Sequence, residues 1–183
     1  LLFTMLMLLT IGISGFAQSA QYVTYGDTTT YSTSSQSPLP GYYGYHKSAV
    51  MYTADELALG AGSMITEVAW QTGSATSGTL MAPFSIYLLE TSDDNIDANT
   101  VWADLISNAT LVYSGECTTI ANSWTNFILT TPFTYNGSNL VVITVGQGCS
   151  TNGGCSKAVK YSTTHQTQAW TFCKDNSAIP DDL

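Results

Sequence analysis

The chain has 183 residues, of which 44% are hydrophobic, 11% aromatic and only 9% charged, and four Lys without any Arg stand against 13 acidic residues for a net charge of −9. This length predicts one domain that is large enough to bury a core. Four Lys cannot form the basic stripe that nucleic acids bind, so the composition argues against a nucleic-acid partner. The 27 Thr, 20 Ser and 11 Tyr are typical of an all-β extracellular domain.

Residues 1–16 form an apolar run without any charge, and Gly15 and Ala17 provide small side chains where a signal peptidase cuts. We therefore interpret residues 1–17 as a signal peptide, N-terminally truncated because the chain begins with Leu1. A membrane-spanning helix needs about 20 apolar residues, and this run is shorter. The mature chain is expected to be secreted or displayed at the cell surface and to have no membrane span.

The polar residues 18–37, rich in Thr and Ser, are predicted to be a linker or a first edge strand, and a Pro-containing turn follows at residues 38–41. Residues 42–52 are strand-like. The sequence TADE at residues 53–56 has the pattern of a capping box, which predicts a short helix that ends near Gly60. No other helix is predicted after the signal peptide.

The remainder of the chain is predicted to form strands, because short apolar or alternating segments are separated by Gly, Ser and Asn. In the first of these strands, Met64, Val68 and Trp70 are expected to share one face. Asn136-Gly137 predicts a tight hairpin turn. Many short strands at regular spacing favour a β-sandwich. The predicted strands lie at residues 64–71, 84–89, 111–113, 124–129, 133–135, 140–145, 157–161 and 169–173.

Four cysteines in an exported chain predict two disulfides, for which three pairings exist. Cys149 and Cys155 bracket a Gly-rich loop and are predicted to pair with each other, which leaves Cys117 to pair with Cys173. A zinc site of three Cys and His165 is a weaker alternative, because the spacings match no common ligand pattern.

Residues 93–104 form an acidic loop whose oxygen-bearing side chains fall at alternate positions, a spacing similar to that of calcium loops. Ala98 stands where an EF-hand loop requires Gly, so a solvated acidic turn is the stronger interpretation. No cofactor is predicted except this candidate calcium ion. The candidate ligands are Asp93, Asn95, Asp97, Asn99 and Asp104.

Catalytic motifs are missing from the sequence. His46 and His165 are its two histidines, neither lies in a recognisable motif, and no Gly-x-Ser-x-Gly sequence occurs. Acidic residues are numerous enough for hydrolysis by a carboxylate pair, but a domain of this size rarely builds a deep cleft. The protein is therefore not expected to be an enzyme, and a small hydrolase is the weakest functional hypothesis.

Several short sequences occur in an order that resembles a family of secreted β-sandwich modules common in Bacteroidota, the adhesin domains of gingipain-type and other type IX-secreted proteins. The resemblance implies a jelly-roll-like antiparallel β-sandwich with one short helix over residues 38–176, followed by the truncated start of a linker at residues 177–183. It also implies a non-catalytic adhesion or binding unit of a larger protein. The matching sequences are MYTADEL at 51–57, ITEVAW at 65–70, SIYLLET at 85–91, LVYSG at 111–115 and a Trp-to-Leu signature at 124–140.

The leading hypothesis is a non-catalytic module for adhesion or recognition, whose partner is a glycan or an extracellular protein surface, next to other domains of the same polypeptide. The alternative is a structural spacer that supports a secreted peptidase or glycosidase domain and binds nothing itself. Aromatic residues gathered in one exposed patch would favour binding. Because aromatic rings stack on sugar faces, five aromatic residues are the candidates for ligand binding: Tyr42, Tyr43, Tyr45, Trp102 and Trp170.

Overall fold

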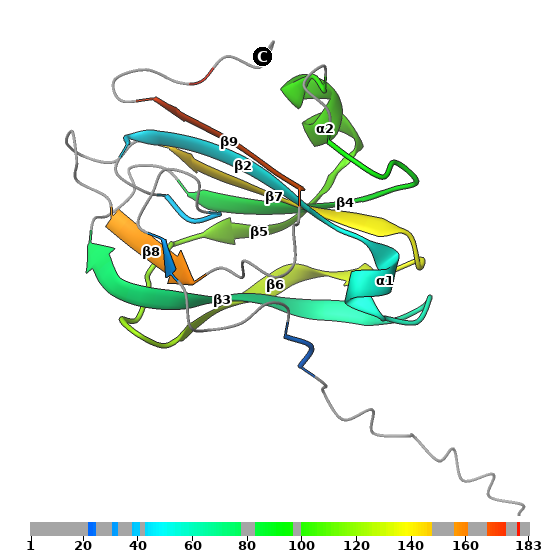
Figure 1. Ribbon diagram of the computed structural model, residues 1–183, viewed down its shortest axis with the longest axis horizontal. Coiled ribbons are helices and arrows are strands. Elements are labelled where there is room, and N and C mark those ends of the chain that lie inside the picture. The colour runs from blue at the N-terminus through cyan, green and yellow to red at the C-terminus, as the bar shows by residue number, and fades with distance from the viewer. Residues whose placement is uncertain are drawn as a thin grey trace, which may run out of the picture.

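The computed structural model describes residues 22–24, 31–32, 38–40, 43–77, 83–96, 100–147, 156–160, 168–174 and 179. These residues form two antiparallel sheets that face each other across a core, and the helix α2 (Trp102–Asn108) lies over the outer side of one sheet (Figure 1). The fold is an all-β sandwich, as the sequence predicts. In the described part of the chain, no helix is long and apolar enough to cross a membrane.

The two sheets contain five and four strands, in the orders β5-β4-β7-β2-β9 and β1-β8-β3-β6. The antiparallel pairs β2–β9, β3–β8 and β4–β7 are nested, with the earlier strands paired to the later ones, as in a jelly roll. The strands of the larger sheet are β5 (Thr110–Gly115), β4 (Phe84–Thr91), β7 (Asn139–Gln147), β2 (Tyr45–Tyr52) and β9 (Gln168–Lys174). Those of the smaller sheet are β1 (Tyr31–Ser32), β8 (Ser156–Lys160), β3 (Met64–Ser77) and β6 (Trp124–Thr134).

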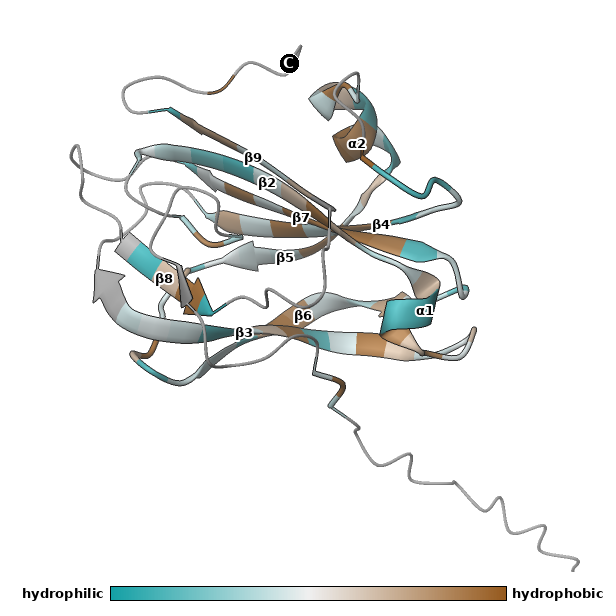
Figure 2. Ribbon diagram, viewed as in Figure 1, coloured by the Kyte–Doolittle hydropathy of each residue, from teal (hydrophilic) through white to brown (hydrophobic). Residues whose placement is uncertain are grey.

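The core fills the space between the two sheets. Phe84, Ile86 and Leu88 alternate along β4 and are fully buried, and the ring of Phe127 on β6 packs against Phe84 with the centroids 5.3 Å apart. β7 is almost continuously apolar, as its brown ribbon shows, because its two sides belong to two different apolar clusters (Figure 2). A strand that is covered on both sides loses the alternating pattern of a half-exposed one.

The predicted capping box forms at the start of α1 (Ala54–Leu57). The Thr53 hydroxyl accepts a hydrogen bond from the Glu56 backbone amide at 3.2 Å, and the Glu56 carboxylate accepts one from the Thr53 amide at 2.8 Å. The helix ends earlier than predicted, because Ala58 takes the left-handed conformation (φ 47°) and serves as the C-cap in place of Gly60.

The second helix, α2, is not among the predicted elements. Its N-cap residue Val101 makes no side-chain hydrogen bond, so the sequence carries no capping signal there. Trp102 and Leu105, three residues apart, are both buried and hold the helix on the outer side of the five-stranded sheet. Tertiary packing of one apolar side therefore stabilises this short helix.

The predicted common face for Met64, Val68 and Trp70 is wrong at its first residue. Val68 and Trp70 pack against the core, whereas Met64 is 61% exposed. The pairing of β3 with β6 shifts between Ile65 and Glu67, and this irregularity reverses the side to which the beginning of β3 points.

The predicted ends of the domain are described only in part. The edge strand predicted within residues 18–37 is present as β1, whose two residues pair with β8. The proposed signal peptide at residues 1–17 lies outside the described residues. Within the predicted linker at 177–183 the structure describes Ile179, and its side chain is buried.

Candidate functional site

The outer side of the five-stranded sheet, which we call the covered face, carries an aromatic cluster beneath α2. The Trp102 ring lies 6.2 Å from that of Trp170, and Phe172 meets Trp170 edge-on at 4.3 Å between centroids. The Lys47 ammonium lies 5.2 Å from the centroid of the Trp102 ring, a cation–π contact. Trp102 is only 3% exposed. This cluster attaches α2 to the sheet, and the buried Trp102 ring is unavailable to a ligand.

Two of the predicted ligand-binding residues, Trp102 and Trp170, are thus brought together, but inside a packed cluster. Tyr45 lies on β2 on the same side as Lys47 and is half-buried, since alternate residues of a strand share a face. Tyr43 precedes β2 and is 36% exposed. Tyr42 lies outside the described residues. The five predicted aromatic residues therefore do not form one exposed patch.

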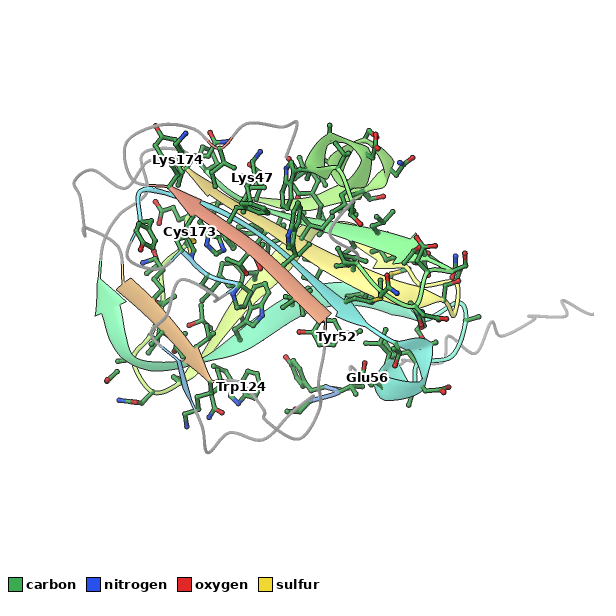
Figure 3. The ribbon with its side chains drawn as sticks, turned by 45° about the horizontal axis from the view of Figure 1, so that its top comes forward. Lys47, Tyr52, Glu56, Trp124, Cys173 and Lys174 are labelled. Carbon is green, nitrogen blue, oxygen red and sulfur yellow. The ribbon has the colours of Figure 1, made fainter. Side chains whose placement is uncertain are left out.

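The outer side of β6 and of the adjoining part of β3 is different, and we call this surface the open face. It does not extend over all of β8, where Ala158 points to the same side but is only 1% exposed. Trp124, Asn126 and Ile128 alternate along β6 with buried residues and point away from the core. Trp124 is 42% exposed and Ile128 is 73% exposed. Figure 3 shows Trp124 on the opposite side of the molecule from Lys47 and Lys174. In the part of the chain that the structure describes, no helix covers the open face and no aromatic ring stacks on Trp124.

The neighbouring strand β3 completes the open face with polar side chains. Gln71 is paired with Trp124, Ala69 with Asn126, and Glu67 with Ile128. The open face therefore combines one exposed indole with two amides and a carboxylate.

Two oxygens of the open face are unusual. Glu67 Oε1 and Gln71 Oε1 are both buried and have no hydrogen-bond partner. A buried acceptor without a donor costs free energy, commonly about 1–3 kcal/mol. The open face thus holds hydrogen-bonding capacity that the described fold does not use.

One cation borders the open face. Val159 of β8 belongs to the core and is paired with Thr72 of β3, so the next residue, Lys160, points outward beside Gln71. Lys160 and Glu67 are the two charged groups that β8 and β3 place on this side. Among the described residues these two opposite charges cancel, so this part of the open face carries no net charge in a chain of net charge −9.

Sequence analysis did not select Trp124, although it placed this residue in a strand. The apolar residues of WTNFIL fall on both sides of that strand, so the pattern does not tell which side is buried. A signal does exist: in an extended strand Phe127 and Leu129 point to one side, and Trp124 and Ile128 point to the other. If the side with Phe127 and Leu129 faces the core, the other side must carry an exposed indole.

A thiol–imidazole pair lies on the inner side of the five-stranded sheet, where His46 is buried and Cys173 is half-buried. Cys173 Sγ of β9 is 3.5 Å from Nδ1 of His46 on β2, and Nε2 of His46 is buried without a hydrogen-bond partner. Burial lowers the pKa of His46 to about 4, although a hydrogen bond with the Pro38 backbone opposes the change. Burial also raises the pKa of Cys173 to about 11. Both groups are therefore neutral at pH 7, whereas a Cys–His nucleophile requires a thiolate beside an imidazolium.

The predicted Cys117–Cys173 disulfide is not formed in the structure. Cys117 follows β5 and is buried in the core, where desolvation raises the pKa of its thiol to about 12 while the charge of Lys157 opposes this rise. Cys173 instead faces His46 within the five-stranded sheet. The predicted Cys149–Cys155 pair and the zinc candidate His165 lie outside the described residues.

The acidic loop leads from β4 toward α2. Its described residues Ser92, Asp93, Asp94, Asn95 and Thr100 line a shallow polar hollow. Asp104 lies in the first turn of α2, while Asp97 and Asn99 lie outside the described residues. Among the described residues, no group of three His, Cys, Asp or Glu side chains is arranged to hold a metal ion. The calcium site stays a prediction.

No family model, curated protein or solved structure matches the chain significantly. The resemblance to secreted adhesin modules therefore stays a prediction from short sequence motifs.

Proposed function

We propose that this protein is a non-catalytic recognition module that is exported from the cell and binds its partner through the open face. The observation that carries the proposal is the exposed Trp124 on the outer side of β6, beside Glu67 and Gln71, which each have a side-chain oxygen without a hydrogen-bond partner. Exposed tryptophans beside polar groups are typical of binding surfaces, because a large rigid ring gains contact area at little entropic cost.

Two further observations support a non-catalytic role. The thiol and the imidazole of the Cys173–His46 contact are both neutral at pH 7, so the pair offers no activated nucleophile. The described hollow near Asp93 is shallow and polar, unlike the deep and mainly apolar pocket that usually holds a small substrate.

Export is supported by the sequence. The apolar residues 1–16, the small residues near Ala17 and the abundance of Thr, Ser and Tyr all favour a chain that works outside the cell. We infer that the module belongs to a larger secreted or surface-displayed protein, as the resemblance to adhesin-type modules implies.

The test is a binding screen of the mature chain against immobilised extracellular glycans and matrix proteins, with Trp124→Ala as the variant. We expect the variant to lose binding by about tenfold or more, as truncation of a central aromatic residue does. Tyr43→Ala is the matched control, because Tyr43 has a similar exposure (36% against 42%) but does not lie on the open face. If both variants bind as the wild type does, the open face is not the binding site and the proposal fails. If the wild type binds nothing, the spacer hypothesis is favoured instead.

A further inference from the structure

The chemistry of the open face narrows its partner to one ligand class, and this inference rests on the proposed function. We propose that the open face binds an uncharged, hydroxyl-rich chain, a neutral polysaccharide, which lies along β6 with one sugar ring on Trp124.

The first argument concerns hydrogen bonds. The unpartnered atoms of the open face, Glu67 Oε1 and Gln71 Oε1, are acceptors, so they need a partner that brings donors. Sugar hydroxyls donate, whereas sulfate, phosphate and carboxylate groups only accept. The anionic group of a charged ligand could not donate to either oxygen and would place its charge beside the Glu67 carboxylate.

The second argument concerns charge. Lys160 and Glu67 offset one another, and the rest of the open face, Trp124, Asn126 and Ile128 on β6 with Gln71 on β3, is uncharged. A surface built for an ionic partner would carry an excess of one sign. Lys160 can donate to ring or hydroxyl oxygens, and Glu67 can accept from hydroxyls, so both charges suit a polyol.

The third argument concerns shape. Trp124 and Ile128 lie four residues apart on β6, a separation of about 13 Å for a rise of about 3.3 Å per residue. Between them, Asn126 stands opposite the small Ala69. Along β6 the open face therefore carries an exposed indole at one end, an amide in the middle and an exposed apolar side chain at the other end. A short stretch of an extended polysaccharide fits this length, and its C–H faces can lie on both apolar residues.

The experiment is affinity electrophoresis of the mature chain in gels that contain one soluble polysaccharide each. The neutral members are a galactomannan and a mixed-linkage β-glucan, and the anionic members are polygalacturonate and dextran sulfate. We expect at least one neutral polysaccharide to retard the protein, with less than about a twofold change in affinity between low and high salt, because no counterions are released. Trp124→Ala and Gln71→Ala should each weaken retardation, whereas Tyr43→Ala should not.

The outcomes separate this inference from the proposed function. Retardation only by anionic members, or retardation that high salt abolishes, overturns the neutral-ligand inference. If no polysaccharide retards the protein but a matrix protein binds it and Trp124→Ala abolishes that binding, the inference fails while the recognition function stands. If a neutral polysaccharide binds equally well to the wild type and Trp124→Ala, the open face is not the site, and both proposals fail.

Discussion

The two outer faces of the sandwich carry similar residues but use them differently. On the covered face, Trp102 and Trp170 pack against each other under α2, and Lys47 lies over the Trp102 ring. On the open face, Trp124 has no ring partner among the described residues and stands beside polar groups. An aromatic residue in a β-sandwich thus favours binding only when no described element packs over its ring. The covered face explains why α2 stays in place, and the open face is where we propose that a partner docks.

The largest expected difference between the faces is in stability. Trp102→Ala should lower the free energy of unfolding by about 3–5 kcal/mol, because it removes a 97%-buried ring and detaches α2 from the sheet. Trp124→Ala should cost about 1 kcal/mol or less, since its ring is already 42% exposed. Denaturant unfolding of both variants measures this difference. Equal losses would mean that the two faces do not differ in the way described.

We expect His46, on the inner side of the five-stranded sheet, to make the stability of the protein sensitive to acid, an effect that the residues of the two outer faces do not produce. The pKa of His46 is about 4 in the fold against about 6.5 in the unfolded chain. The unfolded state therefore takes up a proton first, and stability that is complete above pH 6.5 should fall by up to about 3 kcal/mol as the pH drops to 4. A His46→Gln variant, whatever its stability at pH 7, should show a shallower slope between these two pH values. An identical slope would show that His46 is not the titrating group.

Two alanines provide a smaller and closely matched comparison. Ala49 is fully buried on the covered face between Trp170 and Ile143, its partners on β9 and β7. Ala69 lies on the open face opposite Asn126. Ala49→Leu should cost about 1–3 kcal/mol through overpacking, whereas Ala69→Leu should stay within about 0.5 kcal/mol. The melting temperatures of the two variants measure this difference in stability. Ala69→Leu should also obstruct ligand binding, because it places a larger side chain beside Asn126 on the open face.

Most of the framework could be predicted from the sequence, since local rules determined it. The capping box at residues 53–56 forms as predicted, because its hydrogen bonds join neighbours in the chain. Asn136-Gly137 turns the chain as predicted, with Gly137 at φ 101°, but β6 and β7 belong to different sheets, so the predicted hairpin pairing of the two flanking strands is wrong. The alternating apolar residues of β4 fill the core. Each of these features depends on a short stretch of sequence.

The parts that escaped prediction depend on contacts between distant segments. α2 has no capping signal, and its stability comes from the ring of Trp170, 68 residues beyond Trp102 in the numbering. The irregular pairing near Ile65 exposes Met64, which no local pattern reveals. The side to which Trp124 points is fixed by which residues of β6 meet β4 across the core. The predicted Cys117–Cys173 bridge relied on elimination, and the fold places these thiols in different surroundings.

The central claim is that the open face binds and the covered face does not, and indole N–H signals in a nuclear magnetic resonance titration test it most directly. The chain has four tryptophans, so a labelled sample gives four such signals, which single substitutions can assign. On addition of a retarding polysaccharide, the signal of Trp124 should shift while those of Trp102 and Trp170 stay in place. A shift of Trp102 or Trp170 with Trp124 unchanged would contradict the account.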